Sequence, residues 1–113
     1  MESENRPWGA FYVVDEGPGF KVKRIVVKEG GRLSLQSHKH RAEHWTIVEG
    51  TATVTVGKTV HTLTRSQSID IPFQAIHRLE NLHKGEVVVI EVQFGDYLGE
   101  DDIIRYEDVY QRG

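Results

Sequence analysis

Residues able to bind a metal ion are concentrated between Gly30 and Gly50. Three of the six histidines lie in that stretch, together with a glutamine and a glutamate within nine residues: Gln36, His38, His40, Glu43 and His44. Imidazole nitrogens and carboxylate or amide oxygens are common ligands of divalent metals in proteins. The composition of this stretch therefore predicts a metal site.

An extended strand over this stretch would sort its side chains onto two faces. Because successive side chains alternate along a strand, Gln36, His38 and His40 would point one way, and Leu33 and Leu35 the other. One face is therefore predicted to pack into a core and the other to hold a ligand.

The return of the chain adds a carboxylate to this set. We expect a turn over residues 39–42 and then an antiparallel return strand, which would bring Glu43 beside Gln36 and His38. Three ligands from one hairpin would leave a metal half enclosed, so a fourth donor is expected from elsewhere. His77, which follows an apolar strand-like segment, is the candidate.

Length and composition limit the function classes. The 113 residues predict a single domain over residues 1–113, and 38% hydrophobic and 27% charged residues with a net charge of -3 predict a soluble protein without general affinity for nucleic acid. No apolar run approaches the about 18 residues of a membrane helix, and no signal peptide is recognised, so we expect a cytoplasmic location and no membrane partner. The absence of cysteine excludes disulfides and thiolate ligands.

The elements that must position these donors are short strands separated by turns. Strands are expected at residues 6–14, 20–28, 43–48, 51–56, 59–63, 66–71, 78–82 and 87–94. Gly17-Pro18-Gly19 and Gly57-Lys58 are predicted turns. This pattern indicates an all-β sandwich or barrel. A polar, loose start over residues 1–5 and one short helix within residues 101–110 complete the prediction.

The spacing of the metal-binding residues resembles the two motifs of the cupin family. The first is glycine, five residues, histidine, one residue, histidine, three or four residues, glutamate, six residues and glycine. The second is proline, one residue, glycine, two residues, histidine, three residues and asparagine. The matching positions are Gly30, Gln36, His38, Glu43 and Gly50 in the first motif and Pro72, Gln74, His77 and Asn81 in the second.

This chain departs from the cupin pattern at two positions. Gln36 replaces the first histidine, and Gln74 replaces the turn glycine. A register through His38 and His40 would place His44 at the glutamate position, but it loses the six-residue gap to the following glycine. The register that begins at Gln36 is therefore preferred.

A closer resemblance is to type II mannose-6-phosphate isomerases. It is carried by residues 6–9, 33–38, 41–45, 71–72, 77–78, 90–93, 97–103 and 110–112. The resemblance implies an all-β cupin barrel, also called a double-stranded β-helix or jelly roll, that interconverts mannose 6-phosphate and fructose 6-phosphate. In that family the cupin domain often follows a mannose-1-phosphate guanylyltransferase domain. This chain is too short to include one, so the isomerase activity alone is expected.

The resemblance also implies a ligand set for a divalent metal. The predicted ligands are Gln36, His38, Glu43 and His77, with zinc expected first and manganese, cobalt or iron as alternatives. A divalent metal suits this isomerisation because it polarises the carbonyl and the neighbouring hydroxyl of an open-chain sugar. Gln36 is the weakest ligand of the four. The alternative is that these residues only share hydrogen bonds at strand edges.

Candidates for proton transfer are Glu91, His44 and Arg41, with Glu80 and Gln93 as further possibilities. Glu91 lies in an apolar strand, where it either faces the interior, which would raise its pKa, or faces water at an edge. His44 would point away from the metal if its strand is regular, so a packing role is the alternative. His40 and Lys39 either reach the substrate or are solvated in the turn.

Binding of the sugar phosphate requires cations near the site. The predicted substrate-binding residues are Arg41, Arg78, Lys23, Arg105 and Gln93, since guanidinium groups suit a phosphate dianion. His61 and His83 are predicted to face solvent. A homodimer is also expected, because the apolar faces of Leu33 and Leu35 and of the first strands would exceed what one small barrel leaves exposed.

Two other functions compete with the isomerase. A non-catalytic cupin module would bind a sugar phosphate or nucleotide sugar, for sensing or to associate with a separate guanylyltransferase chain. An oxygen-using iron cupin is the third hypothesis. Gln36 argues against it, because it puts an amide in the place of one histidine ligand. The presence of Arg41, Glu91 and the C-terminal segment favours the enzyme, since a module that only binds would need fewer of them.

Overall fold

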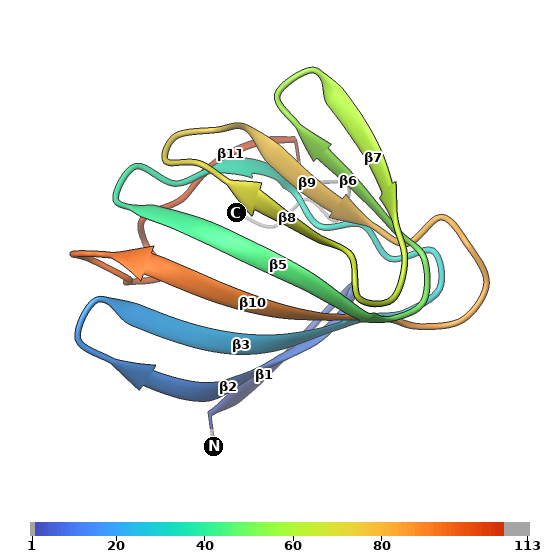
Figure 1. The fold of residues 1–113 in the computed structure, drawn as a ribbon, viewed down its shortest axis with the longest axis horizontal. Coiled ribbons are helices and arrows are strands. Elements are labelled where there is room, and N and C mark those ends of the chain that lie inside the picture. The colour runs from blue at the N-terminus through green and yellow to red at the C-terminus, as the bar shows by residue number, and fades with distance from the viewer. Residues whose placement is uncertain (1, 108–113) are drawn as a thin grey trace.

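A computed structural model of the chain describes residues 2–107, which form eleven β-strands and no helix (Figure 1). The strands are β1 (Ser3–Arg6), β2 (Gly9–Gly17), β3 (Phe20–Val27), β4 (Leu35–Ser37), β5 (Arg41–Glu49), β6 (Ala52–Val56), β7 (Thr59–Leu63), β8 (Ser68–Ile71), β9 (His77–Glu80), β10 (Val87–Gly95) and β11 (Ile104–Glu107). The all-β prediction is confirmed. The described residues thus include no helix that could cross a membrane.

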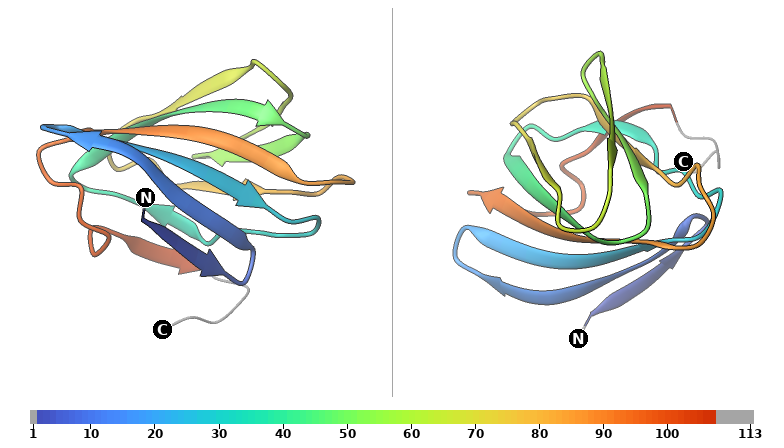
Figure 2. Two further views of the ribbon diagram at one scale, coloured as in Figure 1. Left: turned by 90° about the horizontal axis from the view of Figure 1, so that it is seen from below. Right: turned by 45° about the vertical axis from the view of Figure 1, so that its right-hand side comes forward.

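The strands form two antiparallel sheets that curve around a common interior (Figures 1 and 2). The larger sheet has the order β1-β2-β3-β10-β5-β8, and the smaller has the order β11-β4-β9-β6-β7. Strands adjacent in the larger sheet come from distant parts of the sequence, since β10 lies between β3 and β5. This order brings the two halves of the chain together along β10.

A cluster of buried apolar side chains fills one part of the interior: Trp8, Phe11, Val13, Ile25, Val27, Trp45, Ile47, Ala52, Val54, Ile71, Leu79, Val87 and Val89. On most strands these residues alternate with more exposed ones, as expected for strands that present one face to a core. Burying them removes apolar surface from water, which is the main force that closes the barrel.

The predicted hairpin between the histidine strand and the glutamate strand is wrong. β4 lies in the smaller sheet, where Gln36 pairs with His77, whereas β5 lies in the larger sheet between β10 and β8. Residues 38–40 therefore form a corner at which the chain passes from one sheet to the other. Glu43 approaches His38 across the barrel and not along a shared ladder.

Both ends of the chain also differ from the prediction. Residues 3–5, expected to be loose, belong to β1 (Ser3–Arg6), and the strand expected over residues 6–14 is divided, because β2 begins only at Gly9. The turn before Gly9 brings its backbone against Val26, where a Cβ atom would collide with the carbonyl oxygen, and its φ of 150° favours glycine.

The helix expected within residues 101–110 is wrong over the described residues. Residues 104–107 form β11, which pairs with β4 and covers that edge of the smaller sheet. A hydrogen bond between the hydroxyls of Ser37 and Tyr106 (2.9 Å) supports this pairing. An open strand edge is a strong template for another strand, and this outweighed the local helical preference. Residues 108–110 lie outside the described residues.

Candidate metal centre and substrate pocket

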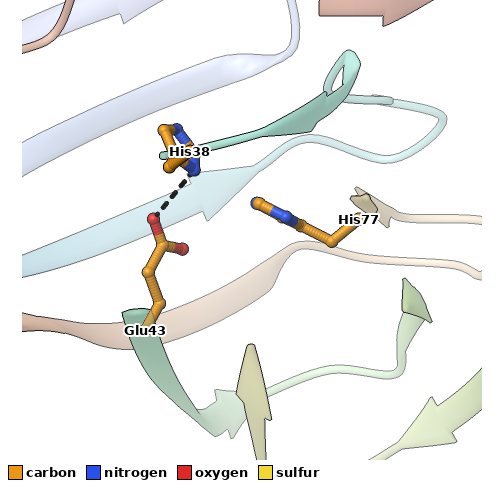
Figure 3. A group of neighbouring side chains, drawn as sticks. All are labelled: His38, Glu43 and His77. Atoms are coloured by element: carbon orange, nitrogen blue, oxygen red, sulfur yellow. Dashed lines mark ion pairs between the residues drawn. The ribbon is translucent and has the colours of Figure 1, made fainter. Parts of the chain in front are cut away.

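Three predicted ligands converge inside the barrel from three different segments (Figure 3). His38 follows β4, Glu43 lies on β5 and His77 begins β9, and each offers a ligand atom within 4.8 Å of the other two. All three side chains are buried. Buried side chains that converge in this way from both sheets form a donor set suited to one cation.

The two histidines are held in the neutral form that a metal requires. Burial lowers the pKa of His38 to about 3, and the charges of Arg41 and His77 contribute to this shift. Burial also lowers the pKa of His77. The Nδ1 atom of His77 lies 2.9 Å from the carbonyl oxygen of Ala75, and a hydrogen bond donated from Nδ1 would leave Nε2 available as the ligand atom.

Neighbouring side chains orient the carboxylate of Glu43. The Trp45 indole nitrogen donates to Oε1 (2.8 Å), and the Nε atom of Arg41 donates to Oε2 (2.7 Å). Arg41 also lies 2.9 Å from Nε2 of His38 through Nη2. The hydrogen bonds that Trp45 and Arg41 donate to Glu43 are outer contacts of the kind that fix the orientation of metal ligands in known sites. The residues present therefore fit a divalent metal.

Gln36 is placed beside this group. It lines the same pocket, and its backbone pairs directly with that of His77. Its amide nitrogen donates to the Ser34 hydroxyl (3.1 Å) and carbonyl (3.3 Å), so the amide oxygen remains as the atom suited to a metal.

A pocket of about 750 Å³, which includes its open mouth, contains this group. Gln36, His38, Glu43 and His77 all line it, and so do three predicted cations and one predicted catalytic carboxyl. These four further residues are Lys23, Arg41, Arg105 and Glu91. Most of the predicted site residues are thus brought into one cavity.

Glu91 is a buried carboxyl on the inner face of β10. Burial raises its pKa to about 7, and the charge of Glu43 and a hydrogen bond with Glu43 add to this, while Arg41 and Lys23 oppose it. The side-chain amide of Gln93 donates to Oε2 of Glu91 (2.9 Å). Of the two alternatives for Glu91, the interior position is correct. A carboxyl that titrates near neutral pH can both accept and donate a proton.

Gln93 does not line the pocket. It is fully buried beneath Glu91, and its Oε1 has no hydrogen-bond partner among the described residues. The structure therefore places it where it orients Glu91, and not where it would touch a substrate. Gln93 was predicted to bind the substrate, but its contact in the structure is with Glu91.

Arg78, which was also predicted to bind the substrate, points away from the pocket. Its Nε donates to the carbonyl oxygen of Leu33 (3.1 Å), and its Nη2 lies 2.8 Å from a carboxylate oxygen of Glu107. Because adjacent side chains on a strand face opposite ways, His77 in the interior requires Arg78 on the exterior. Its predicted phosphate contact is therefore wrong in position.

His44 and His40 also lie away from the candidate ligands. His44 is on the outer face of β5, since Glu43 points inward, and it pairs with Asp70 (2.6 Å). His40 is exposed at the corner between the sheets, so it does not share a face with His38. The expected common face of Gln36, His38 and His40 is therefore wrong, because the strand ends before His40.

Other polar candidates are engaged elsewhere. Glu80 pairs with Arg32 (2.6 Å) outside the pocket. The backbone nitrogens of Lys39 and His40 donate to the carboxylate of Asp102 (3.1 and 2.9 Å). His83 is exposed, as predicted, and His61 is partly exposed.

The sequence did not reveal Glu100, which lines the pocket from the connection between β10 and β11. Its carboxylate lies 2.9 Å from Nζ of Lys23 and 3.6 Å from Nη1 of Arg41. Glu100 directly precedes residues 101–110, the segment in which a short helix was expected. The pairing of β11 with β4 and the hydrogen bonds of Asp102 and Leu98 with the barrel place this connection at the pocket, and no local signal in the sequence predicts these contacts.

Residues 2–108 match the family described as mannose-6-phosphate isomerase C-terminal. The xanthan biosynthesis protein XanB of Xanthomonas campestris pv. campestris is 58% identical over 107 residues, which cover 95% of this chain and 23% of XanB. The alginate biosynthesis protein AlgA of Pseudomonas aeruginosa is 57% identical, with 95% and 22% coverage. The mannose-1-phosphate guanylyltransferase ManC of Salmonella typhimurium is 51% identical, with the same coverage. The chain spans less than a quarter of the length of these relatives.

Solved structures of low sequence identity share the fold. The capsular polysaccharide assembling protein CapF of Staphylococcus aureus superposes with a TM-score of 0.83 at 18% identity, over 94% of this chain and 34% of that chain. The cupin domain of Schizosaccharomyces pombe Cnp3 gives a TM-score of 0.72 at 20% identity, over 77% and 64%. The predicted cupin fold is confirmed.

Proposed function

Because this chain belongs to the family of mannose-6-phosphate isomerase C-terminal domains, we propose that it interconverts mannose 6-phosphate and fructose 6-phosphate with a bound divalent metal. The observation that carries the proposal is the shared pocket. It combines buried candidate ligands, a buried carboxyl and cations, which are the three components that isomerisation of a sugar phosphate requires.

The metal would be held by His38, Glu43 and His77, with the amide oxygen of Gln36 as the fourth ligand. When bound, it would polarise the sugar carbonyl and the adjacent hydroxyl, which stabilises the negative charge that develops in the transition state. Zinc is proposed first, and manganese, cobalt and iron suit the same nitrogen and oxygen donors.

The protein side chains would bind the sugar and move a proton. Glu91, in the pocket beside the ligands, would take the proton from carbon 2 of the aldose and return it to carbon 1, while a proton passes from the hydroxyl oxygen on carbon 2 to the oxygen on carbon 1. Lys23, Arg41 and Arg105 would bind the phosphate. Gln93 would position Glu91 through its amide hydrogen bond.

A coupled assay that follows fructose 6-phosphate formation tests the activity. We expect turnover with added zinc, manganese or cobalt, and loss of turnover with a chelator or after Glu43→Ala. No turnover with any of these metals would refute the proposal. Conversion of fructose 6-phosphate in deuterated water tests the proton route, because mannose 6-phosphate without deuterium at carbon 2 would exclude an enediol intermediate that exchanges with solvent.

A non-catalytic module that binds a sugar phosphate is the second candidate. Gln36 favours it, because an amide binds a metal more weakly than the imidazole that the cupin pattern places there. Binding of mannose 6-phosphate by calorimetry without turnover in the coupled assay would select this function. The carboxyl of Glu91 favours the isomerase instead, because it lies in the pocket where it could transfer a proton.

A homodimer and a cytoplasmic location are further parts of the proposal. Leu33 packs against the core, so the surface for pairing would instead be the outer face of β10, where Phe94 is 49% exposed beside the half-buried Ile90 and Val92. A monomeric mass by light scattering at micromolar concentration would refute the dimer. Cell fractionation tests the location, which we infer because charged sugar phosphates do not cross membranes unaided.

A further inference from the structure

Residues 96–103 connect β10 to β11 (Figure 2), and we call them the closing segment. Two of these residues, Glu100 and Ile103, line the pocket. The Asp102 carboxylate of the segment accepts hydrogen bonds from the backbone nitrogens of the corner after His38. Its Leu98 carbonyl accepts one from Lys21 (3.4 Å). The segment is thus tied to the barrel on both sides of Glu100, which faces the pocket.

Glu100 joins two cations that the barrel covers almost completely. Its carboxylate lies 2.9 Å from Nζ of Lys23 and 3.6 Å from Nη1 of Arg41. These two side chains are only 5% and 7% exposed, whereas the Glu100 side chain is 48% exposed. Lys23 is further fixed over the ring of Phe11 at 4.2 Å. The two cations are therefore enclosed by the barrel, and the carboxylate is the exposed member of the group, which solvent or a ligand can reach.

Electrostatics explains why a carboxylate is present there. A buried cation without a partner is costly, so Lys23 requires a nearby anion when no ligand is bound, whereas Arg41 also pairs with Glu43 (2.7 Å). Burial opposes ionisation of Glu100, but the charges of Lys23 and Arg41 and the hydrogen bond from Lys23 lower its pKa overall. Carboxylate and phosphate oxygens form the same charge-assisted hydrogen bonds with ammonium and guanidinium groups.

We infer that Glu100 is an internal anion that occupies the phosphate subsite of Lys23 and Arg41 until the phosphate group of a substrate displaces it. This inference rests on the proposed function for its phosphate subsite. A phosphate dianion brings two charges in exchange for one, whereas an unphosphorylated sugar brings none and leaves Glu100 in place. Glu100 therefore lowers the affinity of the subsite for phosphate, and it keeps out groups that bring less negative charge than a phosphate dianion, which makes it a specificity-determining residue.

Calorimetric titration of inorganic phosphate into the chelated chain tests this inference without any metal that could bind phosphate itself. The apparent affinity for phosphate equals the intrinsic affinity multiplied by the fraction of time that Glu100 leaves the subsite free. If Glu100 blocks it nine-tenths of the time, Glu100→Gln should bind phosphate about tenfold more tightly than the wild type. Glu100→Asp keeps the charge but shortens the side chain by one methylene, so it should block the subsite less often and bind phosphate more tightly than the wild type but less tightly than Glu100→Gln.

Glu107→Gln is the matched control. Glu107 is also an exposed carboxylate paired with a covered arginine, Arg78, but it lies outside the pocket. It should change phosphate affinity by less than about twofold, because exposed charges act weakly through salt solution. Equal tightening in Glu100→Gln and Glu107→Gln would overturn the inference, since it would show an effect of net charge alone.

The remaining outcomes are also decisive. Unchanged or weaker phosphate binding in Glu100→Gln would overturn the inference, because a competitor must release affinity when it is removed. Lys23→Met should abolish binding in every background, and absence of phosphate binding from all variants would refute the subsite. If Glu100→Gln does not fold, Glu100→Asp decides the question. Phosphate binding as expected without isomerase turnover would refute the proposed function and leave the role of Glu100 intact.

Discussion

The two ends of the barrel interior differ in polarity although the same two strands build both. At one end β5 and β10 present Ile47 and Val89, which face each other across the ladder. At the other end they present Glu43 opposite Gln93, and Glu91 lies two residues before Gln93 on β10, opposite Trp45. All six side chains are at most 4% exposed. Burial alone therefore does not distinguish the core from the site.

The difference lies in what burial does to the free energy. Burying Ile47 and Val89 removes apolar surface from water and stabilises the fold by about 25 cal/mol per Å². Burying Glu43 and Glu91 costs free energy unless each gains hydrogen bonds or an opposite charge. The polar end can be retained because the apolar end of the same strands compensates for it. Substitutions at the two ends should therefore affect stability and activity separately.

The largest expected effect is loss of a metal ligand. His77→Ala removes one of three converging donors, so metal content should fall and turnover should drop to that of the chelated wild type. Loss of an outer partner alone costs about 10–100-fold in known sites, and loss of a ligand should exceed that. Elemental analysis and the coupled assay measure both, with His61→Ala as the control. Full metal content in His77→Ala would refute its role as a ligand.

Replacement of the buried carboxyl should separate proton transfer from metal binding. Glu91→Gln preserves shape but cannot take a proton, so the turnover number should fall by about 10²–10⁴-fold while metal content stays unchanged. Glu49→Gln, an exposed carboxyl on β5, is the control and should retain full activity. Wild-type turnover in Glu91→Gln would show that another group acts as the base. Glu100 would be tested next, because it is the other carboxyl in the pocket besides the proposed ligand Glu43.

Truncation at the apolar end should act on stability alone. Ile47→Ala removes a side chain that is 1% exposed and should lower the free energy of unfolding by about 2–5 kcal/mol. The adjacent Val48 is 41% exposed, so Val48→Ala should cost far less. Urea denaturation measures both values. Folded Ile47→Ala should still bind metal in the wild-type ratio, and a loss of metal affinity in the folded protein would contradict the separation of the two ends.

The polar end should also make stability depend on pH when the metal is removed. The pKa of Glu91 rises from 4.5 in the unfolded chain to about 7 in the fold, so its contribution is fully present below pH 4.5 and is lost as the pH rises through 7. His38 has the opposite sign, because its pKa falls from 6.5 to about 3, and its contribution is lost as the pH falls below 6.5.

Comparison of chelated wild type with chelated Glu91→Gln isolates the first contribution. The stability of the variant relative to wild type should increase between pH 4.5 and about 7 and then level off. Urea denaturation at pH 5 and pH 8 measures the change. A difference that is the same at both pH values would show that Glu91 titrates normally in the fold.

The sequence predicted the strands, and the grouping of the candidate ligands, better than the connection between them. Alternation and β-branched residues were sufficient for β3, β7 and β10, because these signals act within one strand. The spacing of Gln36, His38 and Glu43 identified the site through its resemblance to cupins. It did not show that the strands of His38 and Glu43 belong to different sheets, because strand pairing depends on contacts between distant residues.

The same limit explains the errors in individual side chains. Alternation correctly separated Glu43 from His44, but it failed at His40 because the strand ends at Ser37. Arg78 was expected at the phosphate because it adjoins His77 in sequence, although adjacent strand residues face opposite ways. Glu100 was not predicted as a site residue, because it comes close to Lys23 only where the chain folds back after β10 to pair β11 with β4.

The smallest expected effect is at His44, which had been a catalytic candidate. Nδ1 of His44 lies 2.6 Å from a carboxylate oxygen of Asp70 on the exposed outer face of β5, and exposed polar pairs of this kind contribute between about 0 and 1 kcal/mol. His44→Gln should therefore change the free energy of unfolding by less than about 1 kcal/mol and leave turnover and metal content unchanged. A strong loss of turnover would mean that the outer face of β5 takes part in the reaction. That result would contradict the conclusion that only the inner face of β5 has a catalytic role. The comparison of the two ends of the interior depends on that conclusion.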